Sequence, residues 1–382
     1  MKSTNKMRRV FGFAMGMILG GAVTLGASSE APPEKAKAKP RIEVCFVLDT
    51  TGSMTGLIEG AKQKIWSIAN EMVSAKPTPE IRIGLVAFRD RGDEYITKDF
   101  DMTNDIDSVY AQLQLFHAAG GGDTPESVNE ALDDAVRKMS WSKSKDVLKI
   151  IFLVGDAPPH MDYADGPKYP QVCKEAVKRD LIINTVQCGT LGETTPIWKE
   201  IAEMSEGSYA AIAQTGNMTA IATPMDAELA ELNRKMGTTL VAYGGEGAYR
   251  MVAAKQRAAE AAPASVAADR LAFNTTAGVA VQGEGELLDG LSSGKMKLET
   301  LKKEELPADL RKLDDKELKG EIEKRQKERA ELQARIQKLS QEREKYLVSE
   351  RKRLADAGKG DSFDEKVASS IRTEAARKNI QY

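Results

Sequence analysis

Oxygen-bearing side chains follow two apolar segments of the sequence in a spacing that could hold a hard metal ion. Asp49, Thr51 and Ser53 stand at alternate positions directly after the apolar run Ile42–Leu48. Asp156 follows the apolar run Val147–Val154. Between them, a Gly-rich stretch leads to Thr124. Carboxylates, hydroxyls and water are the ligands that Mg²⁺ prefers, whereas zinc favours His and Cys. These five residues therefore predict a magnesium site, with Mn²⁺ and Ca²⁺ as open alternatives.

Each of these residues also has a plain structural explanation. Thr124 followed by Pro125 is a typical start of a helix, in which the hydroxyl caps the first turn. Asp49 and Asp156 could be ordinary turn residues. The metal interpretation therefore depends on the five side chains meeting at one edge of the fold.

An alternation of strands and helices would bring them there. Continuous apolar runs indicate strands that are buried on both faces, as in a parallel sheet covered by helices. Helices of ten to twenty residues between such strands predict an α/β fold with a doubly wound, mostly parallel, six-stranded sheet. In such sheets ligands bind outside the carboxyl ends of the strands. The expected strands are Ile42–Leu48, Ile81–Phe88, Glu94–Phe100 (an edge strand), Val147–Val154, Leu181–Cys188 and Ser208–Ala213.

Three motifs give this segment a family resemblance. They are D-T-T-G-S-M at Asp49–Met54, F-R-D-R-G-D-E at Phe88–Glu94 and G-G-G-D-T-P-E-S at Gly120–Ser127. Their order resembles the von Willebrand factor type A (VWA) domain, in a variant found in secreted bacterial proteins. The resemblance covers about residues 41–215 and implies a Rossmann-like fold with a complete metal-ion-dependent adhesion site.

The resemblance also implies roles for the candidate ligands. Thr51, Ser53 and Thr124 would bind the metal directly through their hydroxyls, and Asp49 and Asp156 would bind it directly or through water. One coordination position would stay open for an acidic side chain of a protein partner. A divalent ion with neutral hydroxyl neighbours stays electrophilic, which is consistent with that role.

The N-terminus has the pattern of an export signal. Basic residues near the start precede an uncharged apolar run, Val10–Ala27, and a polar stretch, Ala31–Pro40, follows it. We expect a signal peptide at residues 1–28, a disordered linker at 29–40, and a secreted or periplasmic protein. An uncleaved membrane anchor is the alternative, because about 18 apolar residues is near the lower limit for spanning a bilayer.

The C-terminal part differs in composition. We expect the VWA domain to occupy residues 41–236, an irregular Ala- and Gly-rich region residues 237–305, and a long charged helix with a short terminal helix residues 306–382. Apolar residues of the long helix follow a three-four spacing, but Arg325, Arg329 and Arg343 occupy the positions between them. A sustained coiled coil needs apolar residues there. The pattern favours a solvated helix, and a weak homo-oligomer through this helix stays open.

Composition excludes several functional classes. The chain has 382 residues, two histidines, three cysteines and a formal net charge of −2. Two histidines cannot form a multi-histidine zinc site, and the near-neutral charge argues against nucleic-acid binding. The G-x-S-x-G match at residues 290–294 has no preceding strand and no downstream histidine, so no hydrolase is indicated. We expect no enzyme.

A Cys173–Cys188 disulfide stays open, since both should lie near the same sheet edge.

The favoured function is therefore an extracytoplasmic protein-binding module that uses a divalent metal ion to engage an acidic residue of its partner. A structural cell-envelope scaffold that oligomerises through the C-terminal helix is the alternative. The sequence does not identify the partner.

Overall fold

The computed structural model describes residues 39–216, 220–357 and 363–382. The predicted signal peptide and all but the end of the predicted linker lie outside these residues. None of the helices in the described part of the chain is long and apolar enough to cross a membrane.

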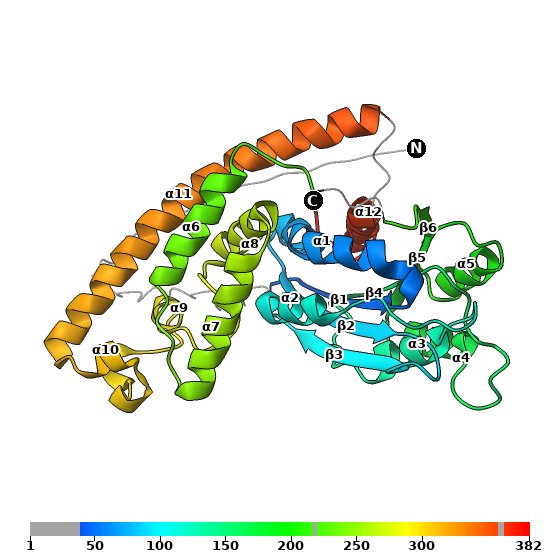
Figure 1. Cartoon of the computed structure of the whole chain (residues 1–382), viewed down its shortest axis with the longest axis horizontal. Helices are drawn as coiled ribbons and strands as arrows, with labels where there is room; N and C mark the ends of the chain where they lie inside the picture. The colour runs from blue at the N-terminus through cyan, green and yellow to red at the C-terminus, as the bar shows by residue number, and fades with distance from the viewer. Residues whose placement is uncertain (1–38, 217–219, 358–362) are drawn as a thin grey trace, which may run out of the picture. The chain divides into compact units, whose positions relative to one another are not determined.

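A six-stranded sheet with the strand order β3-β2-β1-β4-β5-β6 forms the centre of the fold (Figure 1). All neighbours are parallel except β2 and β3, which are antiparallel. The predicted α/β fold is confirmed. Its strands are β1 (Arg41–Asp49), β2 (Glu80–Phe88), β3 (Thr97–Thr103), β4 (Leu148–Gly155), β5 (Ile182–Cys188) and β6 (Tyr209–Ile212). The edge strand β3 begins three residues later than predicted, because Arg89 N–H bonds the carbonyl of Ile96 and residues 89–96 form the connecting loop.

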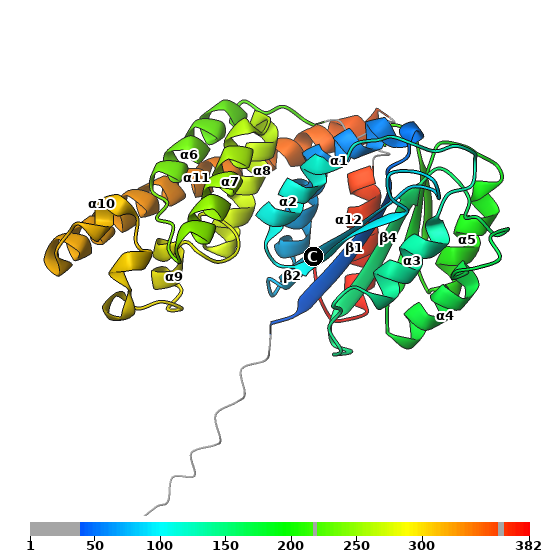
Figure 2. The same cartoon turned by 60° about the horizontal axis from the view of Figure 1, so that its bottom comes forward.

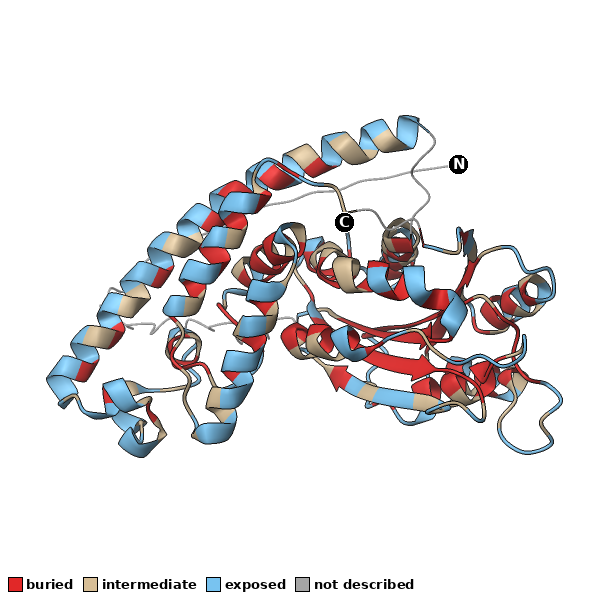
Figure 3. Cartoon of the chain, viewed as in Figure 1, coloured by how far each residue is buried: buried red, intermediate tan, exposed pale blue. Residues whose placement is uncertain are grey.

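Two helical layers cover this sheet. Alternate β1 residues such as Val44 and Phe46 pack against one layer, and Cys45 and Val47 pack against the other, as the two-residue period of a strand requires. Figure 2 shows the layers on opposite sides. Figure 3 shows the central strands β1, β4 and β5 as almost entirely buried, whereas most of the edge strand β3 is exposed or half-buried. The first layer holds α1 (Thr55–Ser74), α2 (Ile106–Leu115) and α12 (Phe363–Ala376); the second holds α3 (Val128–Arg137), α4 (Tyr169–Lys178) and α5 (Thr194–Met204).

The last helix, α12, belongs to the sheet domain. Phe363, Val367 and Ile371 are buried in the same core as β1, and the ring of Phe363 lies 6.3 Å from that of Phe46. The predicted terminal helix, Phe363–Ile371, therefore continues to Ala376 and covers the sheet face beside α1. The chain leaves the sheet after β6 and returns to it at its C-terminal end.

Residues 237–305, which the sequence predicted to be irregular, are largely helical. They contain α7 (Glu246–Ala261), α8 (Ala264–Ala277) and α9 (Leu287–Ser292), and they follow α6 (Asp226–Thr238). The prediction was wrong because it relied on apolar periodicity. Alanine is the strongest helix former, and small alanines such as Ala267 and Ala268 fill buried positions without giving a strong pattern.

The long charged helix α11 (Asp315–Asp356) begins later than the predicted Leu306. Asp314 caps it, and Glu317 completes a capping box by accepting from the backbone N–H of Asp314. A short helix, α10 (Ala308–Arg311), precedes it.

Two arginines of α11 are buried, which corrects the expectation of a helix solvated along that seam. Arg329 bonds Glu286 and Asp289, at 2.8 Å in both ion pairs. Arg343 bonds Asp226 at 2.7 Å and Asp269 at 2.5 Å. The arginine seam therefore packs against α6, α8 and α9 of its own chain.

Candidate metal centre

The candidate site lies where the strand order of the sheet reverses. After β1 the chain builds β2 and β3 on one side and then crosses to β4 on the other, so β1 and β4 are neighbours. Leu48 pairs with Val154, which brings Asp49 and Asp156 to one sheet edge. Gly155 makes this approach possible, since a Cβ there would lie 2.9 Å from the Cβ of Asp49. This is the position at which open α/β sheets bind ligands.

Asp49 and Thr51 form the base of the site, and both are buried. Asp49 Oδ1 accepts hydrogen bonds from the backbone N–H of Thr51 at 2.8 Å and from its Oγ1 at 2.6 Å. Thr51 Oγ1 lies 3.3 Å from Oγ of Ser53, whose side chain is exposed. The alternate spacing read from the sequence therefore places these three oxygens in one connected group.

A cavity of about 260 Å³ opens above this base. Four of the five predicted ligands line it, and Asp49 lies beneath it through its bonds to Thr51. The lining consists of Thr51, Gly52, Ser53, Gly120, Gly121, Asp123, Thr124, Glu126, Asp156, Ala157, Cys188, Leu191 and Gln214.

The glycine loop shapes one wall of the cavity. Gly120 and Gly121 have φ angles of 77° and 81°, a left-handed conformation that glycine adopts without a steric penalty. A Cβ on Gly120 would lie 2.2 Å from a carboxylate oxygen of Asp93, and Asp93 accepts the backbone N–H of Gly121 at 3.1 Å. Gly52 N–H donates to the carbonyl of Gly120 at 3.2 Å. The loop is thereby held against the turn that carries Thr51.

Thr124 lines the cavity but does not begin a helix. The sequence predicted a helix start at Pro125, whereas α3 begins at Val128 and its N-cap position is Ser127. Thr124 is exposed, so its hydroxyl is available to a ligand. Its alternative explanation as a helix cap is therefore wrong.

Asp156 has a partner that the sequence analysis missed. Gln214, which follows β6, donates from Nε2 to Asp156 Oδ2 at 2.7 Å and to the carbonyl of Ser53 at 3.3 Å. This side chain links the two strand ends of the site and fixes the Asp156 carboxylate. No local sequence signal marks Gln214, because its role depends on the position of β6 in the sheet.

Glu126 is a second residue that the sequence analysis missed. It lines the cavity and is 4% exposed, and its Oε2 is a buried atom without a hydrogen-bond partner. Burial raises its pKa to about 9, with Asp49 and other nearby acids adding to the effect. A buried carboxyl group with an unpaired oxygen is costly. Glu126 therefore adds a carboxyl group to the lining of the cavity.

Burial shifts two acids of the site, Asp49 and Glu126, toward their neutral forms. Burial raises the pKa of Asp49 to about 7; the Thr51 hydrogen bonds oppose this, and the charge of Asp156 adds to it. In the described part of the chain, no lysine or arginine forms an ion pair with Asp49, Glu126 or Asp156. Oxygen donors from carboxylates and hydroxyls around the cavity fit a hard divalent cation.

The three cysteines are buried free thiols. Cys173 and Cys188 do not form the bridge that the sequence left open. Burial raises the pKa of the Cys173 thiol to about 12 and that of Cys188 well above its usual value. Neither is suited to nucleophilic chemistry, since the thiolate is the reactive form.

Comparison with known proteins agrees with the family resemblance. Residues 43–224 match the family model of the von Willebrand factor A domain, which confirms a VWA domain in this part of the chain. Human von Willebrand factor A domain-containing protein 7 is 36% identical over 120 residues. The match covers 31% of this chain and 12% of the human protein, and the mouse protein gives the same values. The chain thus spans about an eighth of the length of these relatives.

Solved structures with related folds have low overall similarity. Proximal thread matrix protein 1 from the mussel byssus, in a structure with a zinc-occupied MIDAS motif, is 14% identical with a TM-score of 0.35. That similarity covers 46% of this chain and 42% of the mussel protein. The SpRpn10 VWA domain is 13% identical with a TM-score of 0.35, and the similarity covers 48% of this chain and all of that domain.

Proposed function

We propose that the VWA domain binds a divalent metal ion and uses it to engage an acidic side chain of a protein partner. The metal would be Mg²⁺ in the first instance, held by the five residues predicted from the sequence. The observation that carries the proposal is a cavity lined by carboxylate and hydroxyl oxygens. Its acids Glu126 and Asp156, and Asp49 beneath it, have no basic partner among the described residues. The ligands are Asp49, Thr51, Ser53, Thr124 and Asp156.

The burial of each proposed ligand indicates on which side of the metal it would lie. Asp49 and Thr51 are buried and mutually bonded, so they hold the inner side of the site. Ser53 and Thr124 are exposed and form the outer side, where a partner could approach. A bound divalent ion would supply a positive charge at this opening, which attracts a carboxylate from outside. Gln214 would orient Asp156 through its hydrogen bond of 2.7 Å.

A binding role is favoured over a structural scaffold. The scaffold alternative requires a free face of α11 for self-association. The seam of α11 that carries its buried leucines, isoleucines and arginines already packs against other helices of the same chain. We also propose that the protein works outside the cytoplasm, on the pattern of its first 28 residues, and that its role is binding rather than catalysis.

Metal binding is tested directly on the full chain. Mn²⁺ serves as a paramagnetic probe for the hard-cation site, and its uptake is followed by electron paramagnetic resonance with Mg²⁺ as competitor. Thr124→Ala removes one exposed hydroxyl and should weaken Mn²⁺ binding at least several-fold, and Asp49→Ala should abolish it. Thr276→Ala, which removes an exposed threonine on α8, is the matched control and should bind as the wild type does.

Partner binding is tested in a second step. The immobilised full chain captures proteins from an envelope extract in Mg²⁺ or in EDTA, with Asp49→Ala alongside and its fold checked by circular dichroism. A partner that meets the proposal is retained by wild type in Mg²⁺ and lost in EDTA or with the variant. Equal capture under all three conditions would rule out metal-mediated recognition.

A further inference from the structure

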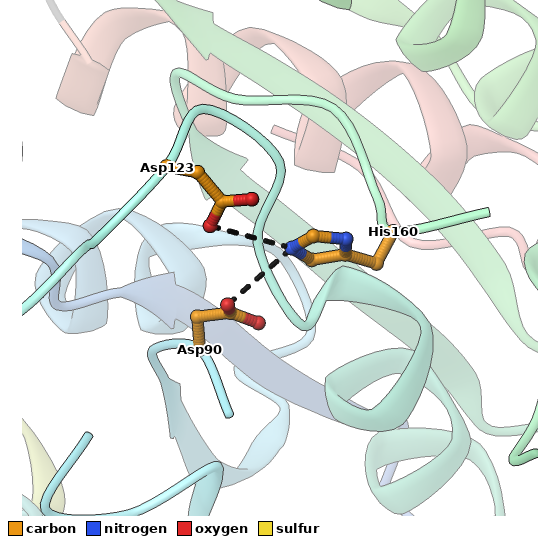
Figure 4. A group of neighbouring side chains, drawn as sticks. All are labelled: Asp90, Asp123 and His160. Atoms are coloured by element: carbon orange, nitrogen blue, oxygen red, sulfur yellow. Dashed lines mark ion pairs between the residues drawn. The ribbon is translucent and has the colours of Figure 1, made fainter. Parts of the chain in front are cut away.

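A second cluster of potential ligands lies beside the cavity, formed by Asp90, Asp123 and His160 (Figure 4). Asp90 follows β2, Asp123 belongs to the glycine loop, and His160 follows β4. His160 Nε2 lies 3.3 Å from Asp90 Oδ2 and 3.7 Å from Asp123 Oδ1. Figure 4 shows the two carboxylates converging on one edge of the imidazole ring.

The imidazole nitrogen that faces these acids has no hydrogen-bond partner. The His160 side chain is 4% exposed, and Nε2 is buried and unpaired. The other ring nitrogen, Nδ1, lies 2.8 Å from Asp162 Oδ1. Because a carboxylate only accepts, Nδ1 carries the hydrogen of that bond, and in the neutral ring Nε2 then presents a lone pair. Two carboxylates that face Nε2 are satisfied either by a proton on that nitrogen or by a cation bound between them.

The distances agree with a four-coordinate metal ion. Zinc binds His nitrogen and carboxylate oxygen at about 2.0–2.2 Å, which places tetrahedral ligand atoms about 3.4 Å apart. Six-coordinate geometry at the same bond length would bring adjacent ligands to about 3.0 Å. The observed 3.3 and 3.7 Å are closer to the tetrahedral value. Three protein ligands would leave a fourth position open, and the 64% exposed side chain of Asp123 shows that solvent reaches the cluster.

Hydrogen bonds and ring stacking from neighbouring side chains orient Asp90 and His160. Ser127 Oγ donates to Asp90 Oδ1 at 3.0 Å, and the Tyr163 hydroxyl lies 3.1 Å from both oxygens of Asp90. The Tyr163 ring stacks on the His160 ring with centroids 4.0 Å apart. The Asp162 bond to Nδ1 fixes the tautomer that directs Nε2 toward the cluster.

The backbone also fixes the loops that carry the cluster. Glu126 N–H donates to the Pro158 carbonyl at 2.9 Å, and His160 N–H donates to the Glu126 carbonyl at 3.1 Å. Asn129 Nδ2 donates to the His160 carbonyl at 2.7 Å. The position of His160 is therefore set before any ion binds.

We propose that Asp90, Asp123 and His160 form a second metal site that binds Zn²⁺. An imidazole with two carboxylates suits Zn²⁺ better than Mg²⁺ or Mn²⁺. This site is chemically distinct from the hydroxyl-rich site of the proposed function. The two are neighbours, because Asp123 belongs to the cluster and also lines the cavity.

Zinc binding is tested on the full chain after removal of metals with a chelator. Excess Mg²⁺ is added first, to keep hard-cation sites filled, and Zn²⁺ is then titrated against a chromogenic competitor. Wild type should bind one equivalent of Zn²⁺. His160→Gln should lower the zinc affinity at least 100-fold, and Asp123→Asn at least 10-fold. His117→Gln is the matched control, since His117 is the other of the chain's two histidines and is exposed.

The variants also distinguish zinc binding at this site from metal binding at the site of the proposed function. Asp49→Ala should lose the Mn²⁺ signal of the first site and keep the zinc equivalent, whereas Asp123→Asn should bind zinc at least 10-fold more weakly. Co²⁺ in place of Zn²⁺ should give the strong visible bands of a four-coordinate ion in wild type, and these should be absent in His160→Gln.

Three outcomes would overturn the proposal. The first is no zinc uptake by wild type, and the second is equal uptake by wild type and His160→Gln. The third is an NMR spectrum in which His160 is doubly protonated at pH 7 without zinc and stays doubly protonated after Zn²⁺ is added. If His160→Gln fails to fold by circular dichroism, Asp123→Asn decides, because its exposed side chain is not needed for packing. Equal zinc affinity of a folded Asp123→Asn and wild type would then refute the site.

Discussion

Replacing Glu374 by Gln should stabilise the protein at high pH and leave its stability unchanged at low pH. Glu374 lies on α12, is 3% exposed, and faces the sheet. Asn184 of β5 donates from Nδ2 to its Oε1 at 2.8 Å, while Oε2 is buried without a partner. Burial raises the pKa of this carboxyl to about 7, against the opposing effects of Asn184 and Arg377.

The direction and size follow from proton linkage. Between the unfolded pKa of 4.5 and the folded pKa of about 7, the folded state binds more protons than the unfolded state. The free energy of unfolding therefore falls as pH rises through this range. At about 1.36 kcal/mol per pKa unit, the ionised Glu374 costs about 3 kcal/mol at pH 8, about 2 kcal/mol at pH 6 and almost nothing at pH 4. Gln is always neutral and avoids this cost.

Urea unfolding of wild type and Glu374→Gln at pH 4, 6 and 8 measures the difference. Wild type and variant contain the same other titrating groups, so the effects of those groups cancel in the difference between their free energies of unfolding. Glu203→Gln, at an exposed position on α5, is the control and should show a small difference that is nearly independent of pH. A Glu374→Gln difference that stays constant between pH 4 and pH 8 would refute the reasoning, and so would a variant less stable than wild type at pH 8.

Two further predictions concern buried groups that are not among the proposed metal ligands. Arg329→Ala should lower the free energy of unfolding by about 3–5 kcal/mol in urea denaturation, because it leaves Glu286 and Asp289 buried without their cation. An unchanged free energy of unfolding would show that water reaches these two acids. All three cysteines should react with an alkylating reagent in the unfolded chain, with or without prior reduction, since they are free thiols. Mass spectrometry counts the adducts, and two fewer adducts without reductant would reveal a disulfide.

The sheet and the base of the candidate site were readable from the sequence for a physical reason. A strand buried on both faces needs a continuous apolar run, and such runs mark β1 and β4 clearly. Parallel strands place their carboxyl ends on one edge, so Asp49 and Asp156 could be assigned to the same place without coordinates. Thr51 and Ser53 could be assigned to the same place as Asp49 because they follow it at alternate positions in one local turn.

Contacts between distant segments could not be read in this way. Glu126 looked like a residue of the first helical turn, since Thr124 and Pro125 form a standard helix start. The helix begins at Val128 instead, and Glu126 is held by the backbone of Pro158 and turned toward the cavity. Gln214 and His160 likewise gain their roles from loops that meet only after the sheet has formed. A single loop residue carries no sequence pattern that would show this.

The arginines of α11 show how the composition of a helix can mislead about its surroundings. Arg at a seam position argues against a coiled coil of identical helices, because like charges would then meet at the interface. The same residue is well placed when the facing helices supply acids, as Glu286 and Asp289 do for Arg329. Buried ion pairs add little net stability compared with apolar contacts, but a mispaired one is costly. These pairs therefore fix which helices pack together and in what register.

The same logic joins the C-terminal helices to the sheet domain. Arg270 of α8 and Asp107 of α2 are both nearly fully buried, and two charge-assisted hydrogen bonds of 2.6 and 2.9 Å connect them. Asp107 Oδ2 also accepts the backbone N–H of Gln282 at 2.9 Å. Separating the helices from the sheet would leave a buried carboxylate and a buried guanidinium without partners, while α12 already covers one face of the sheet. The helical region and the sheet domain thus share one set of buried charges, which ties the packing of the C-terminal helices to that of the sheet domain.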